Sequence, residues 1–329
     1  MPDPSPTRPK RRGRLLRIGA ALLVLSGVVA YLAVQYITGG PGARGCAVVS
    51  GTSAGTSYEF TPEQAVNAAT IAAVGTGRGM PERAVAIALA TAIQESGLRN
   101  IEHGDRDSLG LFQQRPSMGW GTEQQIMDPA YAAGMFYAHL AKVPDYTKMP
   151  LTVAAQRVQR SGYPEAYAKH EPDATLLAAT LTGRAAATLT CDGRPEHTAE
   201  ATGPAAVRAA LVRDFGRDAL QETGAEVGGT EVPSPSPSPS VTSSAQGRTV
   251  TVPVPEGGKK DATGRSERER GWQLAHWAVA NSSALHIERV SYAGREWTAG
   301  SGGTWRTAGS ESAAGAERSV GSVRIVAGQ

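Results

Sequence analysis

The chain contains few aromatic residues and few cysteines. Of its 329 residues, 5% are aromatic and two are cysteines, whereas alanine and glycine are abundant. A folded core must therefore be built mainly from small side chains that pack closely together. The length itself suggests about two domains with connecting segments.

A large net charge is also absent. The formal net charge is +3, and residues 1–17 alone carry six basic residues against one acidic residue. The remainder of the chain is therefore slightly acidic. Nucleic-acid binding requires a positive surface that displaces counterions from phosphates, so we expect no nucleic-acid partner.

Metal-binding and nucleotide-binding motifs are missing as well. His103, His139 and His170 are scattered and lack the spacing of metal ligands. The chain has no Walker phosphate loop. We therefore expect neither a metal nor a cofactor.

One long apolar run lies near the N-terminus. Residues 18–37 are uncharged, and about 20 helical residues rise about 30 Å, the thickness of a bilayer core. The basic residues before the run favour a cytoplasmic N-terminus. A cleaved signal peptide is the alternative, although its apolar region is normally shorter. The sequence predicts a cytoplasmic tail over 1–17, a transmembrane helix over 18–38, and a single-pass cell-membrane protein whose bulk is extracellular.

Cys46 and Cys191 bracket one stretch of the chain after this run. Outside the cell they can oxidise to a disulfide. Closing a loop longer than 100 residues would stabilise the fold by about 4–5 kcal/mol. Two unrelated thiols are the alternative. Residues 39–58 are rich in Gly, Ser and Thr, and predict a short tether.

Helical signals fill residues 59–191. Residues 61–64 (Thr-Pro-Glu-Gln) form a capping box, and small apolar residues follow at helical spacing. Residues 97–121 are rich in Gly, Asp, Ser and Arg, and predict an irregular segment or a hairpin. The expected helices begin near Thr61, Pro81, Asp128, Leu151 and Glu171. This region therefore predicts an α-helical domain with one elaborate loop.

The helical pattern weakens after Cys191. Residues 192–248 contain one amphipathic stretch and an alternating Pro-Ser run over 233–240, which is typical of an extended spacer. Residues 249–329 predict a small α+β domain, so the expected fold class of the whole chain is mainly α. Aromatic residues of this domain would suit glycan contact or would form a small core: Trp272, Trp277, Tyr292, Trp297 and Trp305.

Glu95 is the candidate catalytic residue. It lies near the end of an expected helix, and the preceding turns on its face carry the small residues Ala88, Thr91 and Ala92. An apolar surrounding disfavours the charged form of a carboxyl group, which can then donate a proton to a leaving oxygen. An ordinary solvated glutamate is the alternative.

The neighbourhood of Glu95 resembles the lysozyme-like superfamily, in particular soluble lytic transglycosylases and goose-type lysozymes. The resemblance is carried by Glu95-Ser96, by residues 110–113 (Gly-Leu-Phe-Gln) and by Asp128-Pro129, in that order. Those families have a Glu-Ser pair at the end of a buried helix and a Gly-Leu-Met-Gln type motif on a hairpin that lines the sugar cleft. The resemblance covers about residues 60–180 and implies a lysozyme-like catalytic domain.

The resemblance also implies roles for individual residues. Glu95 would be the general acid and base, Ser96 would orient the loop or the substrate, and Gln113 would contact a sugar. Trp120 would stack on a sugar ring or fill the core. Gln159 and Tyr163 lie where the family has a Tyr-Asn element, and a polar helix face is their alternative.

Asp105 and Asp107 are candidates for a second carboxylate. Residues 104–106 (Gly-Asp-Arg) resemble a goose-type segment, but the second aspartate that the family has past the hairpin motif is replaced here by residues 114–116 (Gln-Arg-Pro). A hydrolase positions two carboxylates around the scissile bond, whereas the lytic transglycosylases that this segment resembles need only one. The resemblance therefore implies, with the second aspartate missing, a transglycosylase that cleaves peptidoglycan between N-acetylmuramic acid and N-acetylglucosamine. The alternatives are a muramidase that uses Glu95 with Asp105, and a non-catalytic wall-binding protein.

Overall fold

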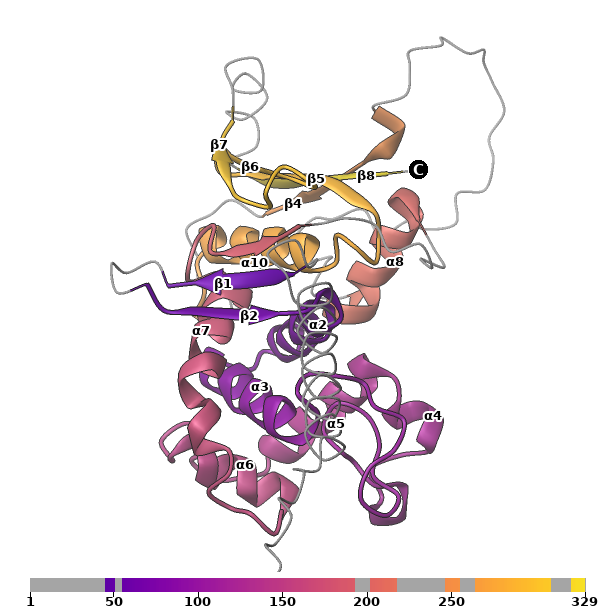
Figure 1. The fold of residues 1–329 in the computed structure, drawn as a ribbon, viewed down its shortest axis with the longest axis vertical. Coiled ribbons are helices and arrows are strands. Elements are labelled where there is room, and N and C mark those ends of the chain that lie inside the picture. Colours follow the sequence, from indigo (N-terminus) through magenta and orange to yellow (C-terminus); the bar gives the residue numbers. More distant parts are fainter. Residues whose placement is uncertain are drawn as a thin grey trace, which may run out of the picture. The chain divides into compact units, whose positions relative to one another are not determined.

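The computed structural model describes residues 45–50, 55–192, 202–217, 246–254, 264–308 and 321–328. Within this part of the chain, a helical body is combined with two β-sheets (Figure 1). The helical body consists of α2 (Pro62–Gly77), α3 (Glu82–Ser96), α4 (Glu123–Ile126), α5 (Pro129–Leu140), α6 (Leu151–Gln159) and α7 (Glu171–Leu181).

Two helices rich in small residues form the centre of the helical body. α2 begins at the predicted capping box, in which the Gln64 N–H donates to Thr61 Oγ1 over 3.2 Å and the Thr61 N–H donates to Gln64 Oε1 over 2.7 Å. α3 ends at Gly97, whose φ of 62° is a left-handed C-cap. A Cβ at Gly75 of α2 would lie 2.6 Å from the Tyr137 ring of α5. Glycine and alanine thus allow these helices to approach closely.

Three short strands form a sheet with the order β2-β1-β3. Their bounds are Cys46–Val49 for β1, Ser57–Phe60 for β2 and Leu189–Cys191 for β3. β1 pairs antiparallel with both neighbours, and Cys46 lies directly opposite Cys191. The two cysteines form a disulfide with a Cα–Cα distance of 4.1 Å, which confirms the predicted staple. The disulfide therefore fastens the start of the described chain to the end of the helical body.

A five-stranded antiparallel sheet has the order β4-β8-β5-β6-β7. Its strands and the two helices of this region are β4 (Thr249–Pro253), β5 (Ile287–Tyr292), β6 (Arg295–Thr298), β7 (Arg306–Thr307), β8 (Ser322–Ala327), α8 (Gly203–Phe215) and α10 (Glu267–Ala280). Buried residues alternate with more exposed ones along β4 and β8. One face of the sheet therefore packs against the core while the other face meets solvent.

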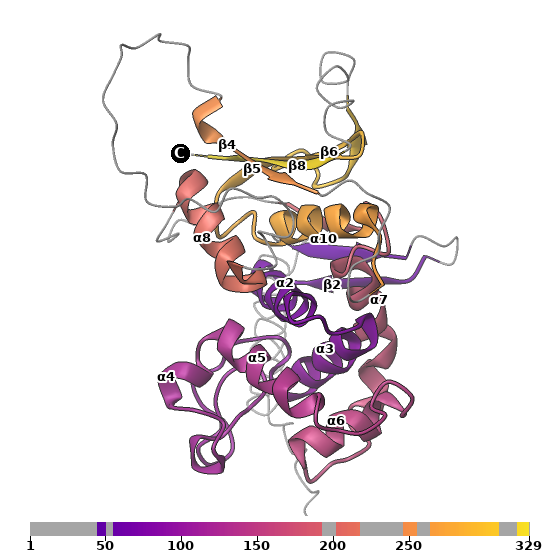
Figure 2. The same ribbon diagram turned by 180° about the vertical axis from the view of Figure 1, so that it is seen from behind.

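α10 lies between the five-stranded sheet and the helical body, as Figures 1 and 2 show from opposite sides. Its Gln273 donates to Thr76 Oγ1 of α2 over 2.6 Å. The Trp277 indole N–H donates to Asp214 Oδ2 of α8 over 2.8 Å. All described residues belong to one unit, Arg44–Gln329. The C-terminal strands and the helical body therefore share one hydrophobic core.

The aromatic residues of the C-terminal region belong to this core. Trp272, Trp277, Tyr292 and Trp297 are all buried, and Trp305 is partly buried against them. Two of the indoles also cover the free edge of β3, because Trp297 Nε1 donates to the Cys191 carbonyl and Trp305 Nε1 donates to the Leu189 carbonyl. These aromatic residues therefore form part of a core, which is one of the two roles that the sequence suggests for them.

The mainly α fold class predicted from the sequence is wrong. The described residues form two sheets, and one of them includes residues 46–49 and 57–60, which the sequence predicts as a tether. A strand of three or four residues is too short to be recognised from the alternation of apolar and polar residues, because that pattern must repeat several times before it stands out. Their pairing partner, β3, is also remote in the sequence.

The predicted transmembrane helix and single-pass membrane localisation are also corrected. Over the ranges that the structure describes, no helix has the length and apolar character needed to cross a membrane. Residues 1–17 and 18–38, on which those predictions rest, lie outside the described residues, as does the Pro-Ser run over 233–240.

Candidate active site

Glu95 lies in the last turn of α3, and its side chain is partly exposed. The Tyr167 hydroxyl donates a hydrogen bond to Glu95 Oε1 over 2.7 Å. Tyr167 is fully buried and lies just before the 3-10 helix η2 (Ala168–His170). A residue 72 positions further along the chain therefore orients the carboxyl group, while Oε2 accepts no hydrogen bond from any described residue.

The protonation of Tyr167 defines its role in this pair. Burial, and secondly the negative charge of Glu95, raise the pKa of Tyr167. The phenol thus stays protonated near neutral pH and serves as the donor. Tyr167 therefore fixes the orientation of the Glu95 side chain through this hydrogen bond.

The segment Gly110–Gln113 is held by the ends of two helices. Ser96 Oγ donates to the Leu111 carbonyl over 2.8 Å. Gln159 Nε2, at the end of α6, donates to the Phe112 carbonyl over 2.8 Å. Ser96 directly follows the candidate acid, so the carboxyl group and this segment are positioned by a common element. Residues 95–96 and residues 110–113, which follow each other closely in the sequence, are therefore also in contact in the folded chain.

The hairpin itself closes through backbone hydrogen bonds. The Leu109 N–H donates to the Gln114 carbonyl over 2.9 Å, and the reverse bond is 3.0 Å long. Gly110, with a φ of 73°, begins the tight turn between them. Buried Phe112 stacks on Phe136 of α5 with ring centroids 4.7 Å apart. The turn is therefore anchored in the core rather than free in solvent.

Gln113 folds back onto its own hairpin. It has a φ of 49°, and its Nε2 donates to the Gly110 carbonyl over 3.2 Å. Its Oε1 lies against Gly104, where a Cβ would overlap it. The side chain is half-buried, and the lack of a side chain at Gly104 makes room for this conformation.

Asp105 and Asp107 have different surroundings. Asp107 accepts from Arg115 Nε over 2.6 Å and from the Ser117 N–H over 2.9 Å. Hydrogen bonds from Ser117 and then from Arg115 hold the pKa of Asp107 well below its usual range. Asp105 is exposed, and its backbone carbonyl accepts from the Ser108 N–H. Asp107 is therefore a structural member of the hairpin, and Asp105 is the more accessible carboxylate.

The remaining predicted substrate contacts lie at the surface or its margin. Trp120 is partly buried and packs against His139 of α5, with ring centroids 4.2 Å apart. The side chain of Tyr163 is 79% exposed. It lies in the loop after α6, where Gln156 Nε2 donates to the Ser161 carbonyl over 2.7 Å. Tyr163 is therefore accessible to a ligand, and Trp120 only in part.

Tyr167 is the site residue that the sequence analysis misses. The resemblance predicts a tyrosine of the site within residues 159–163, whereas the tyrosine that contacts Glu95 is Tyr167, four residues later. A usable signal was its aromatic character within an aromatic-poor domain. Next to the pair, His170 Nε2 lies 3.1 Å from Gln94 Oε1, and burial lowers the pKa of His170.

No cluster of three or more His, Cys, Asp or Glu side chains that could hold a metal ion occurs among the described residues. A carboxyl group with one oxygen fixed by a phenol and one oxygen without a protein partner can give and take a proton.

Comparison with known families gives a match in the C-terminal region. A family model described as VldE, C-terminal domain, matches residues 210–317. The matched residues begin within α8 and include α10 and most of the five-stranded sheet. Glu95 and its hairpin lie outside them. No curated protein matches the chain.

Proposed function

We propose that the chain cleaves the glycan strands of peptidoglycan between N-acetylmuramic acid and N-acetylglucosamine, in the manner of a lytic transglycosylase. The observation that carries the proposal is the Glu95 carboxyl group, oriented by Tyr167 over 2.7 Å and placed beside a hairpin fixed through Ser96. The resemblance of this part of the sequence to lysozyme-like enzymes supports it.

Glu95 would act first as a general acid. Its protonated carboxyl group donates to the glycosidic oxygen while the bond from that oxygen to the sugar C1 breaks. Tyr167 donates to Oε1, so the oxygen without a protein partner, Oε2, is the one that exchanges the proton with the substrate. The same hydrogen bond stabilises the carboxylate that forms as the proton leaves.

Glu95 would then act as a general base. The carboxylate accepts the proton of the sugar's 6-hydroxyl group while that oxygen forms a bond to C1. The product is a 1,6-anhydro sugar, no water is consumed, and Glu95 regains its initial protonation state. One carboxyl group therefore suffices for both steps.

The environment of the aspartates favours this single-carboxylate reaction over hydrolysis. Asp107 is held by Arg115 and Ser117, which stabilises its charge but also occupies both of its oxygens. A base that activates water must be free to accept a proton from it. Asp105 is the remaining candidate for a muramidase mechanism.

Digestion of purified peptidoglycan by the full chain tests the proposal. We expect soluble muropeptides whose mass lacks one water relative to reducing-end products. Glu95→Gln should lower turnover by about 10²–10⁴-fold, because the amide cannot transfer the proton. Glu123→Gln is the matched control, since Glu123 is exposed in the first turn of α4, and it should keep the parent activity.

The alternatives give different results in the same assay. Reducing-end products that disappear in Asp105→Asn would indicate a muramidase. Binding of peptidoglycan without release of any soluble product, unchanged in Glu95→Gln, would indicate a non-catalytic wall-binding protein and would end the enzyme proposal.

A further inference from the structure

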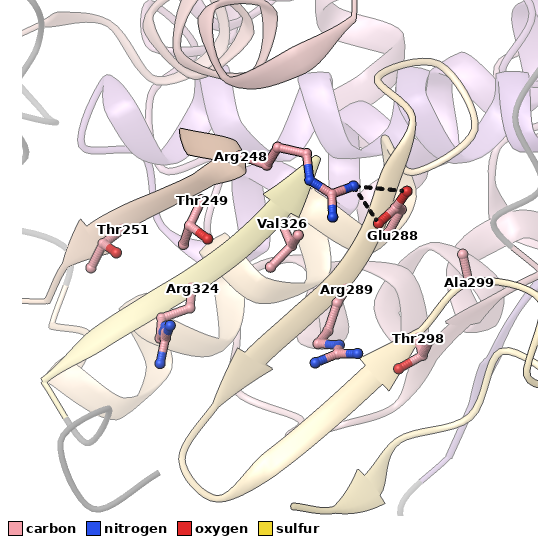
Figure 3. Close-up of a pocket in the computed structure, with 9 residues that line it drawn as sticks. All are labelled: Arg248, Thr249, Thr251, Glu288, Arg289, Thr298, Ala299, Arg324 and Val326. Carbon is pink, nitrogen blue, oxygen red and sulfur yellow. Dashed lines mark hydrogen bonds and ion pairs between the residues drawn. The ribbon is translucent and has the colours of Figure 1, made fainter. Parts of the chain in front are cut away.

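The outer face of the five-stranded sheet carries a polar hollow. Strand pairing places Thr249, Val326, Arg289 and Thr298 in one row across four strands. Figure 3 shows the side chains of the hollow rising from β4, β8, β5 and β6 on the same side of the sheet. The hollow has a volume of about 740 Å³. It is lined by Arg248, Thr249, Thr251, Glu288, Arg289, Thr298, Ala299, Arg324 and Val326.

This face is the one that α10 leaves open. Residues at alternate positions of the same strands, such as Val250, Val290 and Ile325, are buried on the opposite face. Figures 1 and 2 show α10 on that buried side. On the other side, the one helix among the described elements is the short 3-10 helix η3 (Gln246–Arg248), which adjoins β4 and contributes Arg248 to the lining. The polar hollow is therefore accessible with respect to all described elements.

The charge of the hollow is predominantly positive. Its three arginines, Arg248, Arg289 and Arg324, face one lining carboxylate, Glu288. Arg248 Nη1 lies 3.2 Å from Glu288 Oε2, as Figure 3 shows. Arg289 Nε lies 3.7 Å from Glu296 Oε1 at the margin. Arg324 is exposed and forms no ion pair or side-chain hydrogen bond with any described residue.

We propose that this hollow binds a linear polymer that carries phosphate groups and no aromatic bases. The guanidinium group presents a planar fork of donors that matches phosphate oxygens. A phosphate group has more acceptor oxygens than a carboxylate, so it can also accept from the hydroxyl groups of Thr251 and Thr298. The lining of the hollow therefore contains both kinds of donor, guanidinium groups and hydroxyl groups.

The spread of the donors indicates a chain rather than a single ion. Neighbouring strands lie about 4.8 Å apart, and the donors come from four strands. Arg289 and Arg324 lie on adjacent strands in diagonal positions, about 7–8 Å apart. Consecutive phosphate groups of one polymer can therefore contact both. The lining contains no aromatic residue on which a base could stack.

Binding at this face is independent of glycan cleavage at Glu95, so the two proposals can fail separately. The experiment uses the full chain and isothermal titration with poly(glycerol phosphate) at two salt concentrations. Inorganic phosphate, polygalacturonate and single-stranded DNA are compared as ligands. The variants are Arg324→Gln, the double variant R289Q/R324Q, and Arg295→Gln. Arg295 is the matched control because it pairs with buried Tyr292 and therefore belongs to the opposite face.

We expect poly(glycerol phosphate) to bind more tightly than any other ligand tested. Each arginine removed from the hollow should weaken binding about tenfold, and should lower the salt dependence by about one unit of slope. Arg295→Gln should bind as the parent does. Equal binding by the parent and R289Q/R324Q would overturn the proposal, as would DNA or polygalacturonate binding as tightly as the phosphate polymer. Arg324→Gln removes only an exposed side chain, so it decides the matter even if the double variant is less stable.

Discussion

At the scale of single residues, the contact between Tyr167 and Glu95 joins two parts of the helical body. Glu95 lies in the last turn of α3, whereas Tyr167 belongs to the segment that precedes α7, and only the folded chain brings the two oxygens to 2.7 Å. The phenol is fully buried, so its hydroxyl group has a fixed position. Because the donor is fixed, the Glu95 carboxyl group is oriented before a substrate binds.

Replacing Tyr167 by phenylalanine should therefore change activity more than stability. The substitution conserves the volume of a buried ring but removes the donor that orients the Glu95 carboxyl group. We expect turnover of peptidoglycan to fall about tenfold or more. Digestion of purified peptidoglycan measures the turnover, and urea denaturation measures the stability.

Partly buried Tyr58 of β2 provides the control for this variant. Tyr58→Phe should leave the turnover unchanged, since Tyr58 makes no hydrogen bond with Glu95 in the described structure. A Tyr167→Phe enzyme with the parent's turnover would show that the hydrogen bond does not contribute to catalysis.

At the scale of elements, the sequence predicts those helices and strands whose ends are marked by nearby residues. α2 and α5 begin at side-chain caps that are visible in the sequence, Thr61 and Asp128. The three-stranded sheet has no such signal, since its strands are short and β1 pairs with β3 across the whole helical body. At the candidate site, the same division holds. Glu95 and residues 110–113 are near each other in the sequence and are predicted, whereas Tyr167 is remote and is missed.

Two adjacent glycines after β6 test how closely this region packs on the three-stranded sheet. Gly302 and Gly303 both have positive φ values, 78° and 64°. A Cβ at Gly303 would lie 2.3 Å from the Cys191 carbonyl oxygen, whereas a Cβ at Gly302 would meet nothing within 4 Å. Gly302→Ala should therefore destabilise the fold by about 1–2 kcal/mol, the cost of the left-handed conformation alone.

Gly303→Ala carries the same conformational cost and a backbone overlap in addition. We expect it to lower the free energy of unfolding by about 2 kcal/mol more than Gly302→Ala does. Urea denaturation of the two variants under identical conditions measures the difference. Equal destabilisation would mean that the segment after β6 does not pack on Cys191 in solution.

At the scale of the whole molecule, the shared core makes the C-terminal region a structural partner of the candidate site. α10 contacts α2, α7 and β3. Buried Asp214 of α8 accepts from Thr70 of α2 and from Trp277 of α10, which links three helices through one carboxylate. Residues that follow the Pro-Ser run are thus required to complete the core on which α3 and its acid rest. Activity measurements accordingly use the full chain.

His276 of α10 makes the stability of this shared core depend on pH. Its side chain is fully buried, and its Nδ1 lies 2.7 Å from the Thr180 carbonyl of α7, while its Nε2 has no hydrogen-bond partner in the described structure. Burial lowers the pKa of His276 to about 4, whereas an unfolded histidine titrates near 6.5. The imidazole is therefore neutral in the folded protein, and its Nδ1 donates to Thr180.

The depressed pKa fixes the direction of the pH effect. Between about pH 6.5 and pH 4, the unfolded chain binds a proton that the folded chain does not, so the contribution is fully present above pH 6.5 and is lost as the pH falls. Lowering the pH from 7 to 5 should reduce the free energy of unfolding by about 2 kcal/mol through this group alone.

The variant His276→Asn tests this prediction. Its amide nitrogen replaces Nδ1 as a donor to Thr180 but cannot titrate. The variant should be less stable than the parent at pH 7, because a buried ring is lost, yet its stability should fall by about 2 kcal/mol less between the two pH values. Urea denaturation of both proteins at pH 7 and pH 5 measures the two slopes, and parallel slopes would show that His276 is already protonated, or is exposed, in the folded molecule.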